Sequence, residues 1–176
     1  FWAGWFDDWG RDHQKRDPRE TARHAMEALG CGAQYNYYMW HGGTNFAFWG
    51  GRHCEGDDRF QTTSYDFDAP LAEGGGLTEK YYLTRLVNLT ANHMGRFFAS
   101  AALEQPGVSV HDSTDVLNLT GALGNWAIIT NNGREDIPTA TISLPEGETL
   151  EVPLEPLGAA AVPVELDLSE SQMLDY

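Results

Sequence analysis

Two pairs of carboxylates stand close enough in the sequence to suggest acid and base chemistry. Asp7 adjoins Asp8, and Asp66 and Asp68 flank a single aromatic residue. Retaining glycosidases need two carboxyl groups about 5–5.5 Å apart, one as nucleophile and the other as acid and base. Neighbours on an extended segment point to opposite faces, and Asp residues in loops commonly cap turns. Neither pair therefore makes a convincing catalytic dyad.

An aromatic run from Tyr35 to Trp49 is the best candidate for a binding site. Its first half has the composition of a buried strand, and it ends abruptly at Gly42-Gly43. Glycines let the backbone turn sharply and pass close to a ligand, at the strand end where parallel-sheet enzymes gather their site residues. His41 directly precedes these glycines, where it would serve as a hydrogen-bonding residue or, less commonly, as a base.

The segments before this run predict the unit of a parallel α/β sheet or barrel. Phe1 to Gly10 has the character of a strand end that enters a loop. Asp17-Pro18-Arg19-Glu20 then supplies an N-cap, a proline at the first helical position and a Glu three residues beyond the cap. Gly30 closes the helix. One helical face carries the apolar residues Ala22, Ala25, Met26 and Leu29.

A long connection and a second helix follow. Trp40 to about Leu77 is far longer than most loops, and loops beyond about 15 residues are uncommon unless they are functional. A helix is predicted from about Thr78 to Phe98. Its apolar face would carry Tyr82, Leu86 and Leu89, with Leu83 and Val87 beside them.

Past about residue 100 the pattern changes to short β-favouring pieces separated by turn residues, which is typical of an all-β sandwich or barrel piece. We place a domain boundary near Ser100 to Pro106, between a first domain of residues 1–100 and a β-rich domain of residues 101–176. The predicted strands are Val108–Val110, Val116–Leu119, Trp126–Thr130, Thr139–Leu144, Thr149–Val152 and Ala160–Leu166.

Composition excludes several classes of protein. The formal charge of −15, with only 11 Lys and Arg among 176 residues, argues against a nucleic-acid partner. No run reaches the roughly 18 apolar residues of a membrane helix. Cys31 and Cys54 lie at opposite ends of the predicted strand, roughly 23 Å apart if it has seven residues, whereas a disulfide needs Cα atoms within about 7 Å. We expect two free thiols, no metal site and no cofactor.

Four blocks of residues resemble the glycoside hydrolase family 35 β-galactosidases in order and spacing. The blocks are Trp2-x-Gly4-Trp5-x-Asp7-x-Trp9-Gly10, Asn36-x-Tyr38-Met39-x-x-Gly42-Gly43-Thr44-Asn45-Phe46, Thr63-Ser64-Tyr65-Asp66-x-Asp68-Ala69-Pro70-Leu71-x-Glu73-x-Gly75 and Leu77-Thr78-Glu79-Lys80-Tyr81. The β-rich tail is similar, more weakly, to the all-β domain that follows the barrel in this family.

The resemblance implies the fold class and the reaction. The fold would be α/β, the C-terminal portion of a (β/α)8 TIM barrel followed by an all-β, sandwich-like domain. The reaction would be hydrolysis of terminal, non-reducing β-D-galactosyl residues with retention of configuration. The family's nucleophilic Glu directly precedes the block that here begins at Phe1, and its acid/base Glu belongs to an earlier strand. The chain would therefore contain neither catalytic Glu and would be inactive by itself.

The resemblance also implies roles for individual residues. Trp5 would form a wall against the apolar face of galactose, and Tyr38 would turn its hydroxyl toward the nucleophile or the sugar. Phe67 stands where the family usually has a Tyr that reaches galactose, and Asp8 stands where His is often found. Asp66 would anchor the loop from Tyr65 to Pro70. The predicted substrate-binding residues are Trp5, Tyr38 and Phe67, and the predicted supporting residues are Asp66, Asn45 and His41.

Two rival interpretations remain open. The same aromatic pocket would serve a carbohydrate-binding or structural module without chemistry, or a barrel glycosidase that cleaves another sugar. The partner implied by the resemblance is a β-galactoside, as an oligosaccharide, a polysaccharide or the glycan of a glycoconjugate, with no nucleic acid and no membrane. The natural galactoside, its linkage, the compartment and the oligomeric state stay open.

Overall fold

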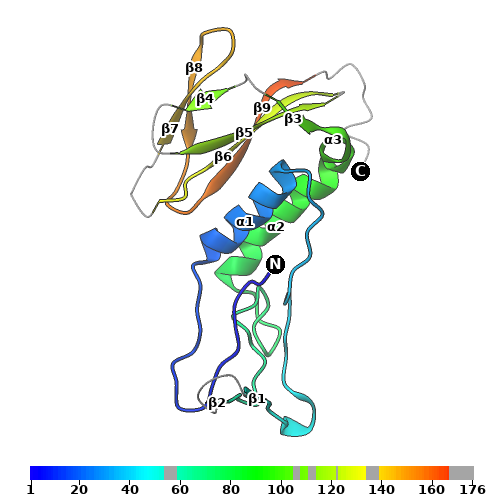
Figure 1. The fold of residues 1–176 in the computed structure, drawn as a ribbon, viewed down its shortest axis with the longest axis vertical. Coiled ribbons are helices and arrows are strands. Elements are labelled where there is room, and N and C mark those ends of the chain that lie inside the picture. Colours follow the sequence, from blue (N-terminus) through cyan, green and yellow to red (C-terminus); the bar gives the residue numbers. More distant parts are fainter. Residues whose placement is uncertain (54–58, 105–107, 111–113, 122, 134–138, 167–176) are drawn as a thin grey trace. The chain divides into compact units, whose positions relative to one another are not determined.

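A computed structural model of the chain describes residues 1–53, 59–104, 108–110, 114–121, 123–133 and 139–166 (Figure 1). The chain divides into two compact units. The first unit contains Phe1–Thr21 and Asn36–Arg85, and the second contains Ala22–Tyr35 and Leu86–Tyr176. The first unit holds the candidate site residues, and the second holds most of the β structure.

Helix α1 spans Pro18–Gly30 and confirms the predicted helix at both ends. The Asp17 carboxylate accepts a hydrogen bond of 2.9 Å from the backbone N–H of Arg19, as an N-cap does. Ala25, Met26 and Leu29 are buried on the predicted apolar face. Gly30 itself is tightly packed, because a Cβ there would lie 3.0 Å from the Ile128 side chain.

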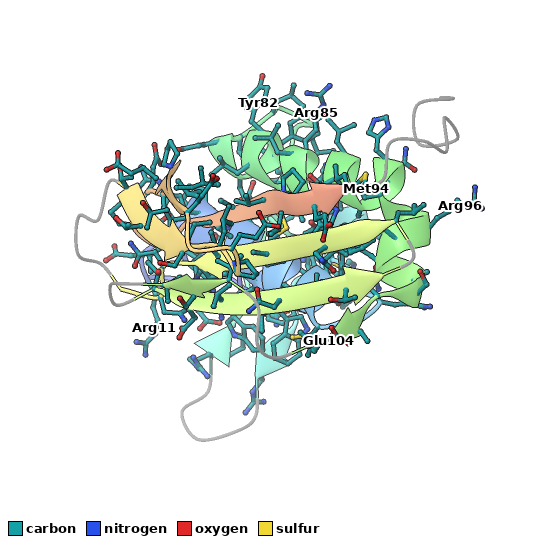
Figure 2. The ribbon with its side chains drawn as sticks, turned by 90° about the horizontal axis from the view of Figure 1, so that it is seen from above. Arg11, Tyr82, Arg85, Met94, Arg96 and Glu104 are labelled. Carbon is teal, nitrogen blue, oxygen red and sulfur yellow. The ribbon has the colours of Figure 1, made fainter. Side chains whose placement is uncertain are left out.

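Helix α2 spans Glu79–His93, and α3 spans Gly95–Ser100. The single helix predicted to Phe98 is therefore broken at Met94, which leaves the helical region with φ −106° and ψ 14° just before a glycine, a residue that weakens helices. Met94 and Arg96 mark this break in Figure 2. A second correction concerns the apolar face of α2.

The predicted face of α2 is exposed rather than buried. Tyr82 is 54% exposed and Leu86 60%, whereas Lys80 and Thr84 are 3% and 0% exposed. The prediction was wrong because it counted apolar residues alone, and the buried side of the first turns carries polar residues that find hydrogen-bond partners inside the unit. Val87 is buried, as expected for a residue beside that face.

Seven strands make up the second half of the described chain, and all six predicted strands are confirmed. β3, a short strand before them, was not predicted. The bounds are β3 Ala102–Leu103, β4 Ser109–Val110, β5 Asp115–Gly121, β6 Gly124–Thr130, β7 Thr139–Ser143, β8 Thr149–Pro153 and β9 Ala159–Leu166. Every described pairing between these seven strands is antiparallel, in one sheet of order β3-β5-β6-β9 and another of order β4-β7-β8 (Figure 1).

These two sheets share one apolar core. Alternate residues of β6 and β7 supply its centre, because side chains on a strand point to opposite faces in turn. Ala127, Ile129, Ala140 and Ile142 are all fully buried there. Valines from both sheets complete the packing, and they include Val116, Val152, Val162 and Val164.

The predicted strand at the start of the aromatic run is not a strand in this structure. Within the described residues, Tyr38 forms a single parallel bridge with Trp2 and is 45% exposed. A regular strand needs a ladder of consecutive pairs, and the facing segment Phe1–Ala3 supplies only one such pair. The long connection also folds on itself, through the 3-10 turn Phe46–Phe48 and a pair of two-residue antiparallel strands.

Strand β1 spans Arg52–His53 and β2 spans Arg59–Phe60, paired in antiparallel fashion. Cys31 is free and exposed. Cys54 lies outside the described residues, so the expectation of two free thiols is met for Cys31 only.

The shared core makes a prediction about stability. Replacing fully buried Ile142 by Ala should lower the free energy of unfolding by about 2–5 kcal/mol, because the cavity adds to the lost burial. Its cross-strand partner Leu150 is 43% exposed, and the matched Leu150→Ala change should cost clearly less. Urea unfolding followed by circular dichroism compares the two. Equal losses would contradict the assignment of this core.

Candidate functional site

The site begins with a short parallel pairing between two distant segments. The backbone nitrogen of Phe1 donates to the carbonyl of Asn36 at 2.8 Å, and Tyr38 N donates to Phe1 O at 2.9 Å. Ala3 N in turn donates to Tyr38 O at 3.3 Å. The two segments lie on either side of α1 in the sequence and run parallel, although neither forms a regular strand.

Two glycines let a loop from a third segment approach this pair. A Cβ on Gly4 would lie 1.8 Å from the carbonyl oxygen of Phe67, and one on Gly42 would lie 1.7 Å from that of Tyr65. No larger residue fits at either position. The approaching loop is itself strained, because Phe67 and Asp68 have φ of 61° and 50°, and each such residue costs about 1–3 kcal/mol unless its surroundings hold it.

Aromatic rings gather around Phe67, which is only 2% exposed. Its ring centroid lies 5.2 Å from that of Phe6, 5.7 Å from that of Tyr38 and 6.2 Å from that of Trp5. The Tyr65 ring stacks on it at 5.7 Å and 9°. Trp5 and Tyr38 remain 37% and 45% exposed. The arrangement is a buried aromatic base with two accessible rings resting against it.

The two tyrosines of this cluster are joined through their hydroxyls. The hydroxyl oxygens of Tyr38 and Tyr65 lie 2.9 Å apart. Burial, together with the hydrogen bond to Tyr38, raises the pKa of Tyr65 above its ordinary value. Tyr65 therefore keeps its hydroxyl hydrogen across the physiological range.

Asp66 holds the turn that presents Phe67. Its two carboxylate oxygens accept from the backbone N–H groups of Asp68, at 3.1 Å, and Glu73, at 2.8 Å. A nitrogen of the His13 ring lies 3.6 Å from the Asp66 carboxylate. A carboxylate occupied by backbone donors holds the conformation of its loop.

The adjacent carboxylates of Asp7 and Asp8 bind different partners. Asp7 accepts from the His13 ring at 2.6 Å and from the Gln14 N–H at 2.8 Å, whereas Asp8 pairs with Arg59 at 3.3 Å. This divergence agrees with the alternation of side chains on an extended segment.

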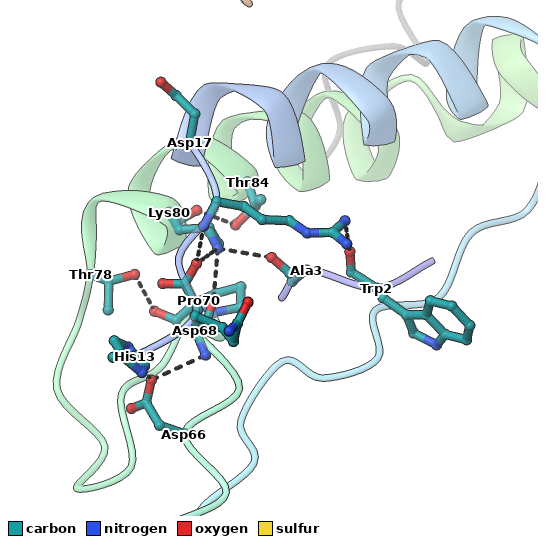
Figure 3. Close-up of polar contacts among 12 residues, drawn as sticks. Trp2, Ala3, His13, Asp17, Asp66, Asp68, Pro70, Thr78, Lys80 and Thr84 are labelled. Carbon is teal, nitrogen blue, oxygen red and sulfur yellow. Dashed lines mark hydrogen bonds and ion pairs between the residues drawn. The ribbon is translucent and has the colours of Figure 1, made fainter. Parts of the chain in front are cut away.

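Lys80, from the first turn of α2, reaches into the same region (Figure 3). Its ammonium donates to Ala3 O at 2.9 Å, to Asp68 O at 2.7 Å and to the Asp68 carboxylate at 2.6 Å. Burial lowers the pKa of Lys80 below its ordinary value, and the hydrogen bond and charge of Asp68 oppose that shift. Sequence reasoning missed this residue as part of the site, although it stands in one of the four matched blocks.

Glu73 forms hydrogen bonds at the edge of the site, here called the rim, which contains His41, Thr44, Asn45 and Ser64. Its carboxylate accepts from the hydroxyls of Ser64 and Thr44, and these bonds lower its pKa below the ordinary 4.5. Its carbonyl contacts the His41 ring at 3.1 Å. On the neighbouring segment, Asn45 donates through its backbone N–H to Thr63 O at 2.9 Å. His41 and Asn45 are thus each held by a hydrogen bond to a neighbouring segment.

The described residues contain no group of three or more His, Cys, Asp or Glu side chains arranged to hold a metal ion. In that same part of the chain, neither α2 nor any other helix combines the length and apolar character that crossing a bilayer requires.

Comparison with known proteins assigns the class. The model of the family described as glycosyl hydrolases family 35 matches residues 1–91, which is half of the chain and contains every candidate site residue. The chain belongs to this family.

The relatives it matches are named as β-galactosidases or similar proteins. A β-galactosidase of Homo sapiens is 46% identical over 85 residues, 48% of this chain and 12% of that protein, and one of Bos taurus is 46% identical over 85 residues, 48% of this chain and 13% of that protein. Beta-galactosidase-1-like protein 3 of Rattus norvegicus is 42% identical over 85 residues, 48% of this chain and 14% of that protein. The matched stretch is therefore a small part of each relative.

The rim carboxylate makes a prediction about pH. The pKa of folded Glu73 lies below 4.5, so Glu73 contributes stability above that pH, and the contribution is lost as pH falls through the lowered pKa. Glu73→Gln and Thr44→Val should both flatten the fall of melting temperature between about pH 5 and pH 3. Thr149→Val, which removes an exposed hydroxyl from β8, is the control. An unchanged acid slope in both rim variants would refute the role.

Proposed function

We propose that the protein containing this chain is a retaining β-galactosidase that hydrolyses terminal, non-reducing β-D-galactosyl residues. Membership of glycosyl hydrolases family 35 and the names of the relatives support this function. The partner is a β-galactoside. The chain supplies part of the sugar site, as the C-terminal portion of a TIM barrel in residues 1–100, followed by a sandwich-like β domain in residues 101–176.

The observation that carries the proposal is the exposed pair of rings on a buried aromatic base. Trp5 and Tyr38 are both accessible and both rest against Phe67, at 6.2 and 5.7 Å between centroids. The Trp5 ring would pack against the apolar C–H face of galactose. The Tyr38 hydroxyl would donate to the sugar or to the nucleophile, and a donor there favours the ionised form of a carboxylate.

Phe67 would contribute differently from the Tyr usual at its position. Because its ring is buried and has no hydroxyl, its share in sugar binding would be the apolar surface on which the other two rings rest. A missing hydrogen bond of this kind is worth about 0.5–1.5 kcal/mol, so the substitution is compatible with activity.

The reaction would follow the two-step route of retaining glycosidases. A carboxylate attacks the anomeric carbon while a carboxylic acid protonates the leaving oxygen, and water then releases galactose from the covalent intermediate. The nucleophile is proposed to directly precede Phe1, whose backbone is held by hydrogen bonds to Asn36 and Tyr38. The acid/base carboxyl would come from an earlier strand of the barrel.

One prediction is that hydrolysis needs parts of the protein outside this chain. The isolated chain should hydrolyse no aryl β-galactoside, whereas the full-length protein should. Turnover by the purified chain would refute the placement of both carboxyls outside it. Galactose binding without turnover by the full-length protein would favour a non-catalytic carbohydrate-binding module, and a Glu directly before Phe1 would favour the enzyme.

A second prediction concerns the two accessible rings. In the full-length protein, Trp5→Ala should lower kcat/KM for an aryl β-galactoside at least about tenfold, equivalent to about 1.4 kcal/mol. Tyr38→Phe should lower it about two- to tenfold, because one hydrogen bond is lost. Tyr82→Phe, at a ring of α2 that is 54% exposed, is the control. Full activity in both site variants would contradict the proposed sugar contacts.

A further inference from the structure

Lys80 is the one buried cation described at the back of the proposed sugar site. Its side chain is 3% exposed, and its ammonium lies between the carbonyls of Ala3 and Asp68 (Figure 3). Ala3 belongs to the segment that carries Trp5, and Asp68 belongs to the turn that carries Phe67. We propose that Lys80 is a positioning residue, which sets the separation of these two segments and thereby the alignment of the Trp5 and Phe67 rings. This inference rests on the proposed galactosidase function.

The hydrogen bonds of Lys80 exclude a direct part in the chemistry. An ammonium group has three protons, and three acceptors surround this one, namely Ala3 O, Asp68 O and the Asp68 carboxylate, at 2.9, 2.7 and 2.6 Å. Every proton therefore has a partner inside the protein. With no free donor and almost no accessible surface, the group can neither reach a substrate nor act as a base.

The place of these acceptors explains what Lys80 controls. Ala3 and Asp68 immediately adjoin Gly4 and Phe67, whose close approach leaves no room for a Cβ on the glycine. The ammonium thus bridges the two backbones at the point where they touch. Because Trp5 follows this contact directly, a change in the spacing at Lys80 moves the ring that would form the wall of the pocket.

A second cation reinforces the same junction from another segment. The backbone N–H of Arg16 donates to the Asp68 carboxylate at 2.7 Å, and its guanidinium contacts Trp2 O at 3.4 Å. Arg16 is exposed, however, whereas Lys80 is buried. Removal of the Lys80 ammonium would leave the Asp68 carboxylate and two carbonyls without their shared donor, and water has little access to replace it.

The test uses the full-length protein and the only two lysines of this chain. Lys80→Met keeps the unbranched chain up to the ε position and removes the charged nitrogen, Lys80→Arg keeps the charge with a planar fork, and Lys15→Met is the matched control at an exposed lysine. Asp68→Asn and the double variant with Lys80→Met complete a double-mutant cycle. Each protein is assayed with an aryl β-galactoside, at a temperature where circular dichroism shows it fully folded.

A positioning role predicts a loss of activity per folded molecule. Lys80→Met should lower kcat/KM at least tenfold and weaken galactose binding, followed by tryptophan fluorescence. Lys80→Arg should keep part of the activity, and Lys15→Met all of it. The double variant should be scarcely worse than Lys80→Met, because both changes break one junction.

Two results would separate the failure of this inference from failure of the proposed function. If folded Lys80→Met protein keeps wild-type kcat/KM and galactose affinity while its melting temperature falls, Lys80 serves stability alone and the positioning role is refuted. If the wild-type protein itself neither hydrolyses β-galactosides nor binds galactose, the proposed function fails first, and the positioning role fails with it.

Discussion

The contact between the backbone of Gly4 and the carbonyl of Phe67 is the constraint on which the candidate site depends. It demands a residue without a Cβ on one side and a turn with two positive φ angles on the other. Neither feature is stable by itself. They persist because the Asp66 carboxylate accepts hydrogen bonds from backbone N–H groups of the turn and the Lys80 ammonium donates to carbonyls of both segments. These polar contacts thus stabilise the strained turn at Phe67 and Asp68, while the rings of Trp5 and Tyr38 remain accessible.

The burial of polar side chains explains how the site is held together. It also explains why the buried face of α2 was predicted wrongly. Apolar periodicity predicted a face with Tyr82 and Leu86, yet the helix buries Lys80 and Thr84. Thr84 donates to the carbonyl of Lys80 at 2.6 Å and so satisfies its own hydroxyl. A lysine inside a protein fits no hydrophobic pattern, because its burial depends on three acceptors from segments that are distant in sequence.

Features that depend on neighbouring residues were predictable, and features that depend on distant partners were not. The cap and end of α1 follow from Asp17 and Gly30, and the β strands of the second half follow from alternation and turn residues. The strand expected at Tyr35 did not form a ladder, since its extent depends on the segments beside it. The association of Trp5, Tyr38 and Phe67 came from resemblance to a family, since no local pattern brings residues so far apart together.

The paired hydroxyls of Tyr38 and Tyr65 have a property that neither tyrosine has alone. Since one of the two hydroxyls donates to the other, the pair has one hydrogen left to offer to a third group. Reversing the bond between them moves that hydrogen from one oxygen to the other, without transfer of charge or movement of either ring. The pair is therefore a donor whose direction can change, at a surface where the hydrogen-bonding needs of a sugar and of a carboxylate would differ.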